Sequence, residues 1–488
     1  MKTMSDSIAV KLSASVSSVI ALVCLTWWLS YNPTARLATH IPGMDNRPTE
    51  SEASKLRAAE ADQVRIGEFL ETYASTQPPA LRGEWPRFRG SKFNNISTEP
   101  VRLASTWSEQ GPKQLWSVAL GEGHAAPAVA DGRVYVLDYD EQNKGDALRC
   151  FSLADGSELW RRWYRVRVKR NHGYSRTIPA VADGYVVTIG PRCHVMCVDV
   201  ESAELKWGID LEKELGTETP LWYTGQCPLI DDSIAVIASG GNALLLGVEL
   251  ATGTIAWQTP NPKGYQMSHS SVMPATLFGK RMYIYCAKGG IVGVSAEEVD
   301  RGELLWESPL WNPSVMAPSP VILPDGRIFV TGGYGAGSAL LQVTEKNGGY
   351  AVDELMKYKP DGGMASEQQT PIFYQNHFFA ILPKDAGVLR KQLVCYASDD
   401  ITTPVWTSGT TNRFGLGPYL IADGKMFVLD DDGVLTMLEV STTAFKPLAQ
   451  AKVMDGTDAW GPMALAGGRL LLRDAHKMIC LDISAPSS

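Results

Sequence analysis

Polar side chains with chemical potential gather in short segments that lead into prolines at recurring positions along the chain. The candidates in these segments are His124, Tyr174, Arg176, Gln226, His269, Glu367, Gln368, Arg413, Asp458 and Trp460. Two arginines, two histidines and two acids, brought together beside amides and aromatic rings, would suit a small anionic or sugar-like ligand. A second interpretation fits the same residues: a hydrated channel mouth whose polar groups satisfy one another and the nearby strand ends.

The elements that would bring these segments together form an internal repeat. Pro127-Ala-Val-Ala-Asp-Gly and Pro179-Ala-Val-Ala-Asp-Gly share one frame, a proline followed by a turn pair and then by alternating apolar residues. An Asp-Gly pair between such runs is typical of a tight hairpin, because Asn, Asp and Gly tolerate positive φ. The frame recurs every 44 to 52 residues, at Pro127, Pro179, Pro228, Pro274, Pro320, Pro371, Pro418 and Pro462.

Each repeat unit can be divided into four strands, and the fourth commonly ends on a tryptophan. Units of about 45 residues with four strands each indicate a β-propeller. The tryptophans are expected to pack between neighbouring blades rather than to do chemistry. They are Trp116, Trp160, Trp207, Trp257, Trp306 and Trp406.

The last unit stops near Leu481 without a fourth strand, whereas Leu115-Trp116-Ser-Val-Ala before the first unit has the pattern of one. We therefore expect the two ends of the repeat region to share one blade. The sequence predicts an all-β fold, an eight-bladed propeller over residues 116–484, preceded by a lead-in segment over residues 83–115.

The N-terminal region is a different kind of sequence. Residues 12–35 carry no charge, and as a helix they would be long enough to cross a bilayer. Trp27, Trp28 and Tyr31 fit an interfacial aromatic belt. We expect residues 1–35 to form a cytoplasmic stub and a signal-anchor transmembrane helix, with the propeller on the periplasmic or extracytoplasmic side. A cleaved secretory signal peptide is the alternative, and the sequence leaves it open.

Residues 36–82 form the predicted linker. Ile66, Phe69, Leu70 and Tyr73 follow the spacing i, i+3, i+4, i+7, which predicts a short amphipathic helix.

Composition narrows the class of function. The chain of 488 residues has 45 Lys and Arg against 53 Asp and Glu, and its net charge of -8 argues against nucleic acid as a partner. Cys150, Cys197, Cys395 and Cys480 occupy equivalent places inside apolar strands, so we expect buried hydrophobic side chains rather than disulfides or metal ligands.

These motifs resemble the pyrroloquinoline-quinone-like (PQQ-like) propeller repeat. Gly247-Val-Glu-Leu-Ala-Thr-Gly-Thr-Ile-Ala-Trp is similar to its blade signature, and Trp85-Pro-Arg-Phe-Arg-Gly is similar to the lead-in of bacterial exported propellers. Other blades depart from the pattern, as where Ala203 replaces the glycine. The resemblance implies one of two classes: quinoprotein dehydrogenases, which hold PQQ and calcium on the propeller axis, or scaffolds such as the propeller lipoprotein of the outer-membrane assembly machinery.

The sequence weighs against the dehydrogenase class. Many of those enzymes carry adjacent cysteines near the quinone, and this chain has no Cys-Cys pair and no Cys-x-x-Cys-His motif. We therefore predict a non-catalytic, membrane-anchored scaffold with protein partners, no metal and no cofactor. A PQQ- and calcium-dependent alcohol or sugar dehydrogenase is the alternative, and a carbohydrate-binding propeller is a weaker one.

Overall fold

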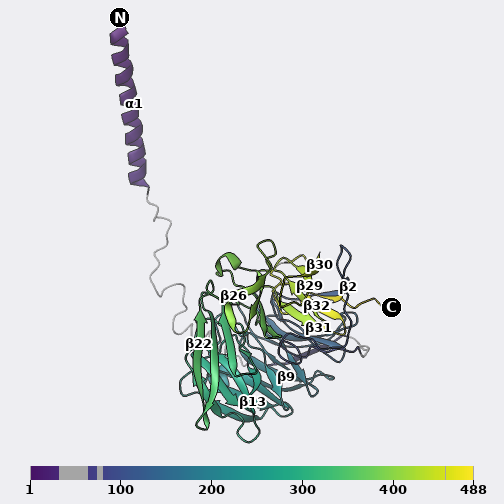
Figure 1. Ribbon diagram of the computed structural model, residues 1–488. Coiled ribbons are helices and arrows are strands. Elements are labelled where there is room, and N and C mark those ends of the chain that lie inside the picture. Colours follow the sequence, from purple (N-terminus) through teal and green to yellow (C-terminus); the bar gives the residue numbers. More distant parts are fainter. Residues whose placement is uncertain (1, 32–63, 74–80, 457, 487–488) are drawn as a thin grey trace. The chain divides into compact units, whose positions relative to one another are not determined.

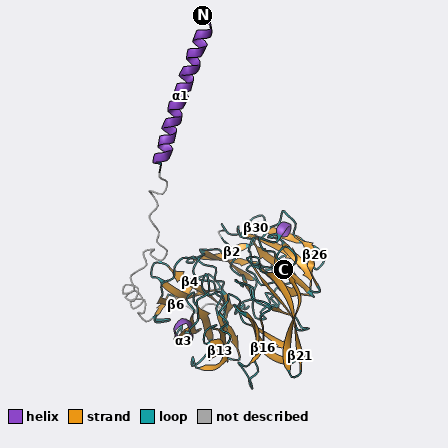
Figure 2. Ribbon diagram, turned by 90° about the vertical axis from the view of Figure 1, so that its left-hand side faces the viewer, coloured by secondary structure: helices purple, strands orange, loops and turns teal. Residues whose placement is uncertain are grey.

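The computed structural model describes residues 2–31, 64–73, 81–456 and 458–486. The chain divides into two units, Met1–Gln63 and Val64–Ser488. The second unit holds eight antiparallel sheets arranged as an eight-bladed propeller, which confirms the predicted fold (Figure 1). Strands dominate it, and its helical pieces are short (Figure 2).

The blades follow one another in chain order. Blade 1 contains β1 (Phe69–Thr72), β3 (Ala128–Ala130), β4 (Arg133–Asp140), β5 (Gly145–Ser152) and β6 (Glu158–Arg165). Blade 2 contains β7 (Ala180–Ala182), β8 (Tyr185–Ile189), β9 (His194–Asp199) and β10 (Leu205–Asp210), followed by α3 (Leu211–Leu215). Blade 3 contains β11 (Leu229–Asp231), β12 (Ile234–Ala238), β13 (Ala243–Glu249) and β14 (Ile255–Pro260). Blade 4 contains β15 (Met273–Leu277), β16 (Lys280–Ala287), β17 (Gly290–Ser295) and β18 (Leu304–Ser308).

The second half repeats the pattern. Blade 5 contains β19 (Val321–Ile322), β20 (Arg327–Gly332), β21 (Gly337–Lys346) and β22 (Gly349–Tyr358). Blade 6 contains β23 (Ile372–Tyr374), β24 (His377–Ile381), β25 (Leu393–Ala397) and β26 (Asp400–Thr407), with the 3-10 turn η2 (Gly387–Leu389) before β25. Blade 7 contains β27 (Tyr419–Ala422), β28 (Lys425–Leu429), β29 (Val434–Glu439) and β30 (Pro447–Lys452). Blade 8 contains β31 (Ala464–Ala466), β32 (Arg469–Arg473), β33 (Lys477–Asp482) and β2 (Lys113–Ala119).

The hairpin turns explain why the repeat folds as it does. Asp131 and Gly132 connect β3 to β4 with φ of 49° and 72°, and Asp183 takes φ of 53° at the same place in blade 2. Asp and Gly tolerate this left-handed region, so the turn pair fixes the register of the inner hairpin. The strands of neighbouring blades then bury their apolar faces against each other, with Val134, Val136 and many equivalents fully buried.

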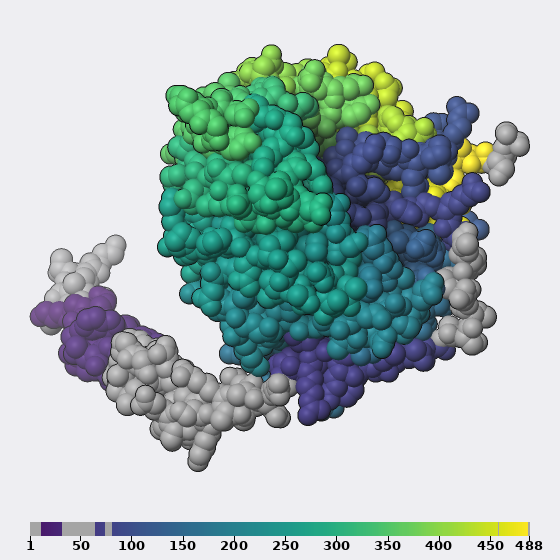
Figure 3. All heavy atoms as spheres, turned by 90° about the horizontal axis from the view of Figure 1, so that it is seen from below, coloured from purple at the N-terminus to yellow at the C-terminus, as the bar shows by residue number. Residues whose placement is uncertain are grey.

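The ring closes as the sequence predicts. β2 pairs antiparallel with β33, placing Trp116 opposite Cys480, and so supplies the outer strand that the C-terminal unit lacks. Figure 3 shows blue residues near position 100 against the yellow C-terminal residues, and Leu103 pairs with Ser484 there.

The predicted amphipathic helix is wrong over the described residues 64–73; the earlier part of that prediction lies outside the described residues. Phe69–Thr72 instead form β1, which pairs with β6 as a fifth strand of blade 1. Phe69 packs on Trp163 with ring centroids 4.4 Å apart, and Glu71 accepts a 2.7 Å hydrogen bond from the indole of Trp163. The open edge of β6 decides the outcome, because pairing with an existing strand overrides a four-residue helical pattern.

The lead-in segment lies across one end of the propeller axis. Its hydrogen bonds and strand-like pairs reach six of the eight blades, a feature that the sequence did not predict. These contacts are Trp85 with Val129, Pro86 with Val181, Arg87 with Ile230, Arg89 with Pro371, Asn95 with Tyr419 and Glu99 with Gly467. The segment therefore closes the end of the axis at which the inner hairpins turn.

Contacts of the blade tryptophans run from one blade to the next. Trp116, Trp207 and Trp406 donate their indole N–H to the carbonyls of Leu153, Leu250 and Ser441 of the following blade, at 3.0, 2.8 and 2.8 Å. The indole nitrogens of Trp160, Trp257 and Trp306 are buried and have no hydrogen-bond partner within the described residues. All eight cysteines are free, and all except Cys24 are buried.

The first unit contains α1 (Lys2–Ser30). Its segment Lys11–Ser30 has a mean hydropathy of 1.8 and is long and apolar enough to cross a membrane. Several polar side chains within it bond to the helix itself: Ser15 and Ser18 donate to the carbonyls of Lys11 and Ala14. These two serines are thus compatible with an apolar surrounding.

Candidate functional site

All eight blades contribute to a cavity of about 330 Å³ on the propeller axis. Most of its walls come from the connections that lead into the inner strands and from hairpins between second and third strands. In an antiparallel blade both kinds of connection open at the same face. The mouth of the cavity therefore lies at one face of the ring, opposite the lead-in segment.

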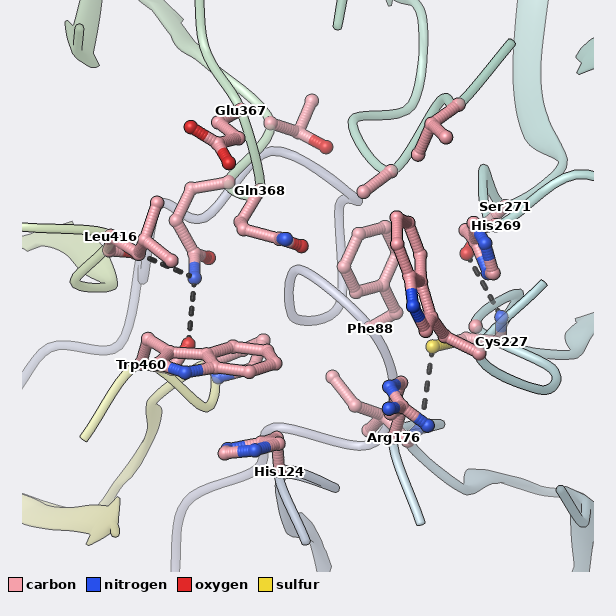
Figure 4. A pocket seen from close by; sticks show the side chains of 18 of the residues that line it. Phe88, His124, Arg176, Cys227, His269, Ser271, Glu367, Gln368, Leu416 and Trp460 are labelled. Carbon is pink, nitrogen blue, oxygen red and sulfur yellow. Dashed lines mark hydrogen bonds between the residues drawn. The ribbon is translucent and has the colours of Figure 1, made fainter. Parts of the chain in front are cut away.

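Seven of the ten predicted site residues line this cavity. They are His124, Arg176, His269, Glu367, Gln368, Asp458 and Trp460. Figure 4 shows Glu367 and Gln368 across the hollow from His124 and Arg176, although these residues come from blades far apart in the sequence.

The other three predicted residues do not line the cavity. Tyr174 stacks on Tyr139 and donates its hydroxyl to Glu141. Gln226 is fully buried, and its amide both donates to the carbonyl and accepts from the N–H of Ala238. Arg413 donates to the carbonyls of Thr410 and Arg390. Each of these side chains satisfies local loop or strand groups instead.

Most of the other wall residues escaped the sequence prediction, and five of them matter for the chemistry of the cavity. Trp222, Tyr334 and Lys384 lie near the mouth, and Phe88 and Arg89 of the lead-in segment lie at the closed end. Tyr334 and Lys384 belong to hairpins between second and third strands, a position that the proline frame does not mark. Equal attention to both kinds of loop at this face would have found them.

Two histidines in the cavity are held neutral. The His124 ring stacks on Trp460, with ring centroids 3.6 Å apart (Figure 4). Burial, reinforced by the charges of Arg473 and Arg176, lowers the pKa of His124 to about 2. Burial and the charge of Arg176 likewise lower the pKa of His269 to about 4. Neither imidazole carries a charge at neutral pH.

The charged groups of the cavity are unevenly paired. Lys384 lies 3.4 Å from Glu367, so these two charges offset each other. Among the described residues, Arg176 donates only to the backbone carbonyls of Asn171 and His172, and Arg89 only to those of Phe93 and Pro371. The Nη1 atom of each arginine has no hydrogen-bond partner within the described residues. The arrangement can bind an anion.

A line of side-chain-to-backbone hydrogen bonds supports the cavity wall from blade to blade. The Cys227 thiol accepts from the N–H of Ile178 at 3.2 Å, and the Ser271 hydroxyl accepts from the N–H of Cys227 at 2.9 Å. The Ser319 hydroxyl then accepts from Ser271, and Thr370 accepts from Ser319, both at 2.9 Å. These bonds fix the spacing of five consecutive blades around the axis.

The donor set does not fit the calcium of a quinoprotein dehydrogenase. Calcium takes about six to eight oxygen ligands, usually including several carboxylates. Within the described residues, no group of three or more His, Cys, Asp and Glu side chains could hold a metal ion. Of the two cavity acids, Glu367 is already paired with Lys384.

Comparison with known proteins agrees with this architecture. The family model described as outer membrane protein assembly factor BamB matches residues 96–161 and 143–385, more than half of the chain. The chain belongs to this PQQ-like propeller family. No curated protein matches it.

Solved structures resemble this PQQ-like propeller at low sequence identity. A europium-containing methanol dehydrogenase is 11% identical with a TM-score of 0.52, over 82% of this chain and 89% of its own. BamB from Moraxella catarrhalis is 12% identical with a TM-score of 0.48, over 76% and 99%. A quinohemoprotein alcohol dehydrogenase from Comamonas testosteroni is 12% identical with a TM-score of 0.42, over 83% and 81%. The first of these likenesses shows the shared fold alone.

Proposed function

We propose that the protein is a membrane-anchored, exported PQQ-like propeller that acts as a non-catalytic binding and assembly scaffold. The observation that carries the proposal is the composition of the axial cavity. The part of the chain that the structure describes offers aromatic faces and hydrogen-bonding cations there, but no converging set of metal ligands. Such walls bind and orient a ligand. The family model, whose description names an assembly factor, supports the same class of function.

The apolar segment Lys11–Ser30 supplies the anchor in this proposal, with the propeller on the periplasmic side. A scaffold held in this way meets membrane-bound partners at a raised effective concentration, because tethering removes much of the cost of encounter. Its rigid ring presents loops from eight blades on one face.

Titration with PQQ and calcium tests the non-catalytic part of the proposal. We expect the full chain, purified in detergent, to give no binding heat and no change in unfolding midpoint with PQQ and CaCl₂. A ligand at 100 times its Kd would stabilise the fold by about 2.7 kcal/mol, which a thermal melt detects. A calcium-dependent shift together with dye reduction by an alcohol or sugar would establish the oxidoreductase instead.

Site-specific photo-crosslinking in intact cells tests the scaffold part. Val388, 77% exposed beside the mouth face, and Val299, 91% exposed in a turn of the opposite face, make a matched pair of positions. We expect one discrete adduct with a membrane protein from position 388 and none from position 299. No adduct from either position would contradict a scaffold that works through this face.

A further inference from the structure

The axial cavity is open at one end and closed at the other. Phe88, Arg89 and Asn95 of the lead-in segment line its closed end, whereas Tyr334 and Lys384 are exposed at its mouth. An occupant must therefore enter and leave through one opening. A polypeptide can do so only with a chain end, because the middle of a chain would need a second opening or a sharp bend.

The volume limits how much can enter. About 330 Å³ lies at the lower end of the roughly 300–1,000 Å³ typical of ligand sites. One or two amino-acid residues would fill it.

The charges select between the two kinds of chain end. His124 and His269 are neutral, and Lys384 and Glu367 offset each other. Within the described residues this leaves Arg89 and Arg176 without an acidic partner. Asp458, exposed at the mouth, is the other acid of the wall. A buried guanidinium with an unused N–H favours a carboxylate, with which it forms charge-assisted hydrogen bonds. A terminal ammonium group would be repelled.

Aromatic rings shape the mouth. Trp222 stacks on Tyr334 with centroids 5.3 Å apart, joining the loop before blade 3 to a hairpin of blade 5, and it also lies 6.3 Å from the His269 ring. Trp222 and Tyr223 take φ of 65° and 73°, a left-handed conformation that is strained for residues other than glycine. Leu221 beside them is 63% exposed. The mouth thus offers apolar surface to the side chain of an incoming residue.

We propose that the axial cavity binds the free carboxyl terminus of a partner polypeptide whose last residue is aromatic or apolar. The terminal carboxylate would lie against Arg176, and the side chain would pack among Trp222, Tyr334 and Trp460. The proposal rests on the scaffold function and names the chemistry of its partner.

A peptide-binding assay tests directly whether the cavity recognises a free carboxyl terminus. The full chain in detergent is titrated into an N-terminally labelled octapeptide that ends in phenylalanine with a free carboxylate, and fluorescence anisotropy is recorded. We expect saturable binding that weakens at least tenfold when the same peptide carries a C-terminal amide. A peptide ending in lysine should also bind at least tenfold more weakly. These comparisons need no change to the protein.

Variants locate the site. Arg176→Gln should weaken binding of the free-acid peptide at least tenfold, whereas Arg413→Gln, which removes a cation of the same face outside the cavity, should leave it unchanged. Trp222→Ala should weaken the free-acid and amide peptides alike, because it removes apolar contact and no charge.

Two results would overturn the proposal: equal binding of acid and amide peptides, or binding unchanged in Arg176→Gln. Either result leaves the scaffold function standing if the adduct from position 388 persists. Calcium-dependent binding of PQQ with dye reduction would instead overturn the scaffold function itself, so the two failures are distinguishable.

Discussion

Replacing Asp146 with asparagine is expected to stabilise the propeller, and to do so more strongly as the pH rises. Asp146 is 2% exposed in β5; its Oδ2 accepts a 2.8 Å hydrogen bond from Tyr164, and its Oδ1 has no partner within the described residues. Tyr164 in turn lies 3.2 Å from His194 of blade 2. Burial raises the pKa of Asp146 to about 7. The carboxyl group is thus protonated in the folded protein under conditions that ionise it in the unfolded chain.

The sign of the pH effect follows from this difference. The folded protein holds a proton that the unfolded chain releases above about pH 4, so stability falls as the pH rises from about 4 to 7. Above pH 7 the ionised, buried carboxylate costs about 4 kcal/mol. Asparagine removes the titration, and its advantage over the natural residue should grow by roughly 3 kcal/mol between pH 5 and pH 8.

Denaturant unfolding of the full chain at pH 5, 6, 7 and 8 measures this advantage. Asp361, an exposed aspartate of a loop, gives the matched control: Asp361→Asn should leave the pH profile unchanged. Parallel profiles for Asp146→Asn and the natural protein would show that Asp146 does not titrate in this range.

Replacing Trp116 with alanine should cost about 3–5 kcal/mol, the range for truncating a large buried aromatic residue. Trp116 is 7% exposed, donates to the carbonyl of Leu153 and packs on Gly156, where a Cβ would lie 2.8 Å from its ring. It also belongs to β2, the strand that closes the ring. Its loss removes packing and loosens the closure together.

Trp207→Ala separates these two effects. Trp207 makes an equivalent 2.8 Å bond to Leu250 between blades 2 and 3, away from the closure. We expect similar losses of unfolding free energy, with a reduced denaturant m-value only for Trp116→Ala, because a frayed closure exposes surface before global unfolding. A loss below 1 kcal/mol for Trp116→Ala would contradict the importance of the closing strand.

Periodicity explains why most of the propeller fold could be predicted from the sequence. The proline frame and the Asp131-Gly132 type of turn are local signals repeated in every blade. The strand pattern at Trp116 supplied the missing outer strand of the eighth blade. The prediction of a helix around Phe69 was wrong because nothing in the local sequence shows that the edge of β6 is free to pair with this segment. Whether such a short segment becomes strand or helix is decided by tertiary pairing.

The candidate site was predictable to the extent that its residues precede the repeated prolines. His124, Arg176 and Trp460 were found in this way. Gln226 occupies an equivalent position in the sequence but does not line the cavity. Sequence position alone does not distinguish a residue of the cavity wall from one whose side chain bonds to its own blade. Trp222 of the loop before blade 3 stacks on Tyr334 of blade 5, and such a contact between loops far apart in the sequence has no sequence period.

The contacts of the lead-in segment determine the order in which parts of this protein can fold during synthesis. Its Glu99 bonds to Gly467, and Ala104 bonds to Ile483. Residues synthesised early can therefore form these bonds only after nearly four hundred further residues have been made. Contacts of such sequence separation form slowly, because a long stretch of chain must be ordered first. The lead-in, although made before every blade, can complete its contacts only after the last blade exists. Until that moment the incomplete ring has an open axis and an unpaired final blade.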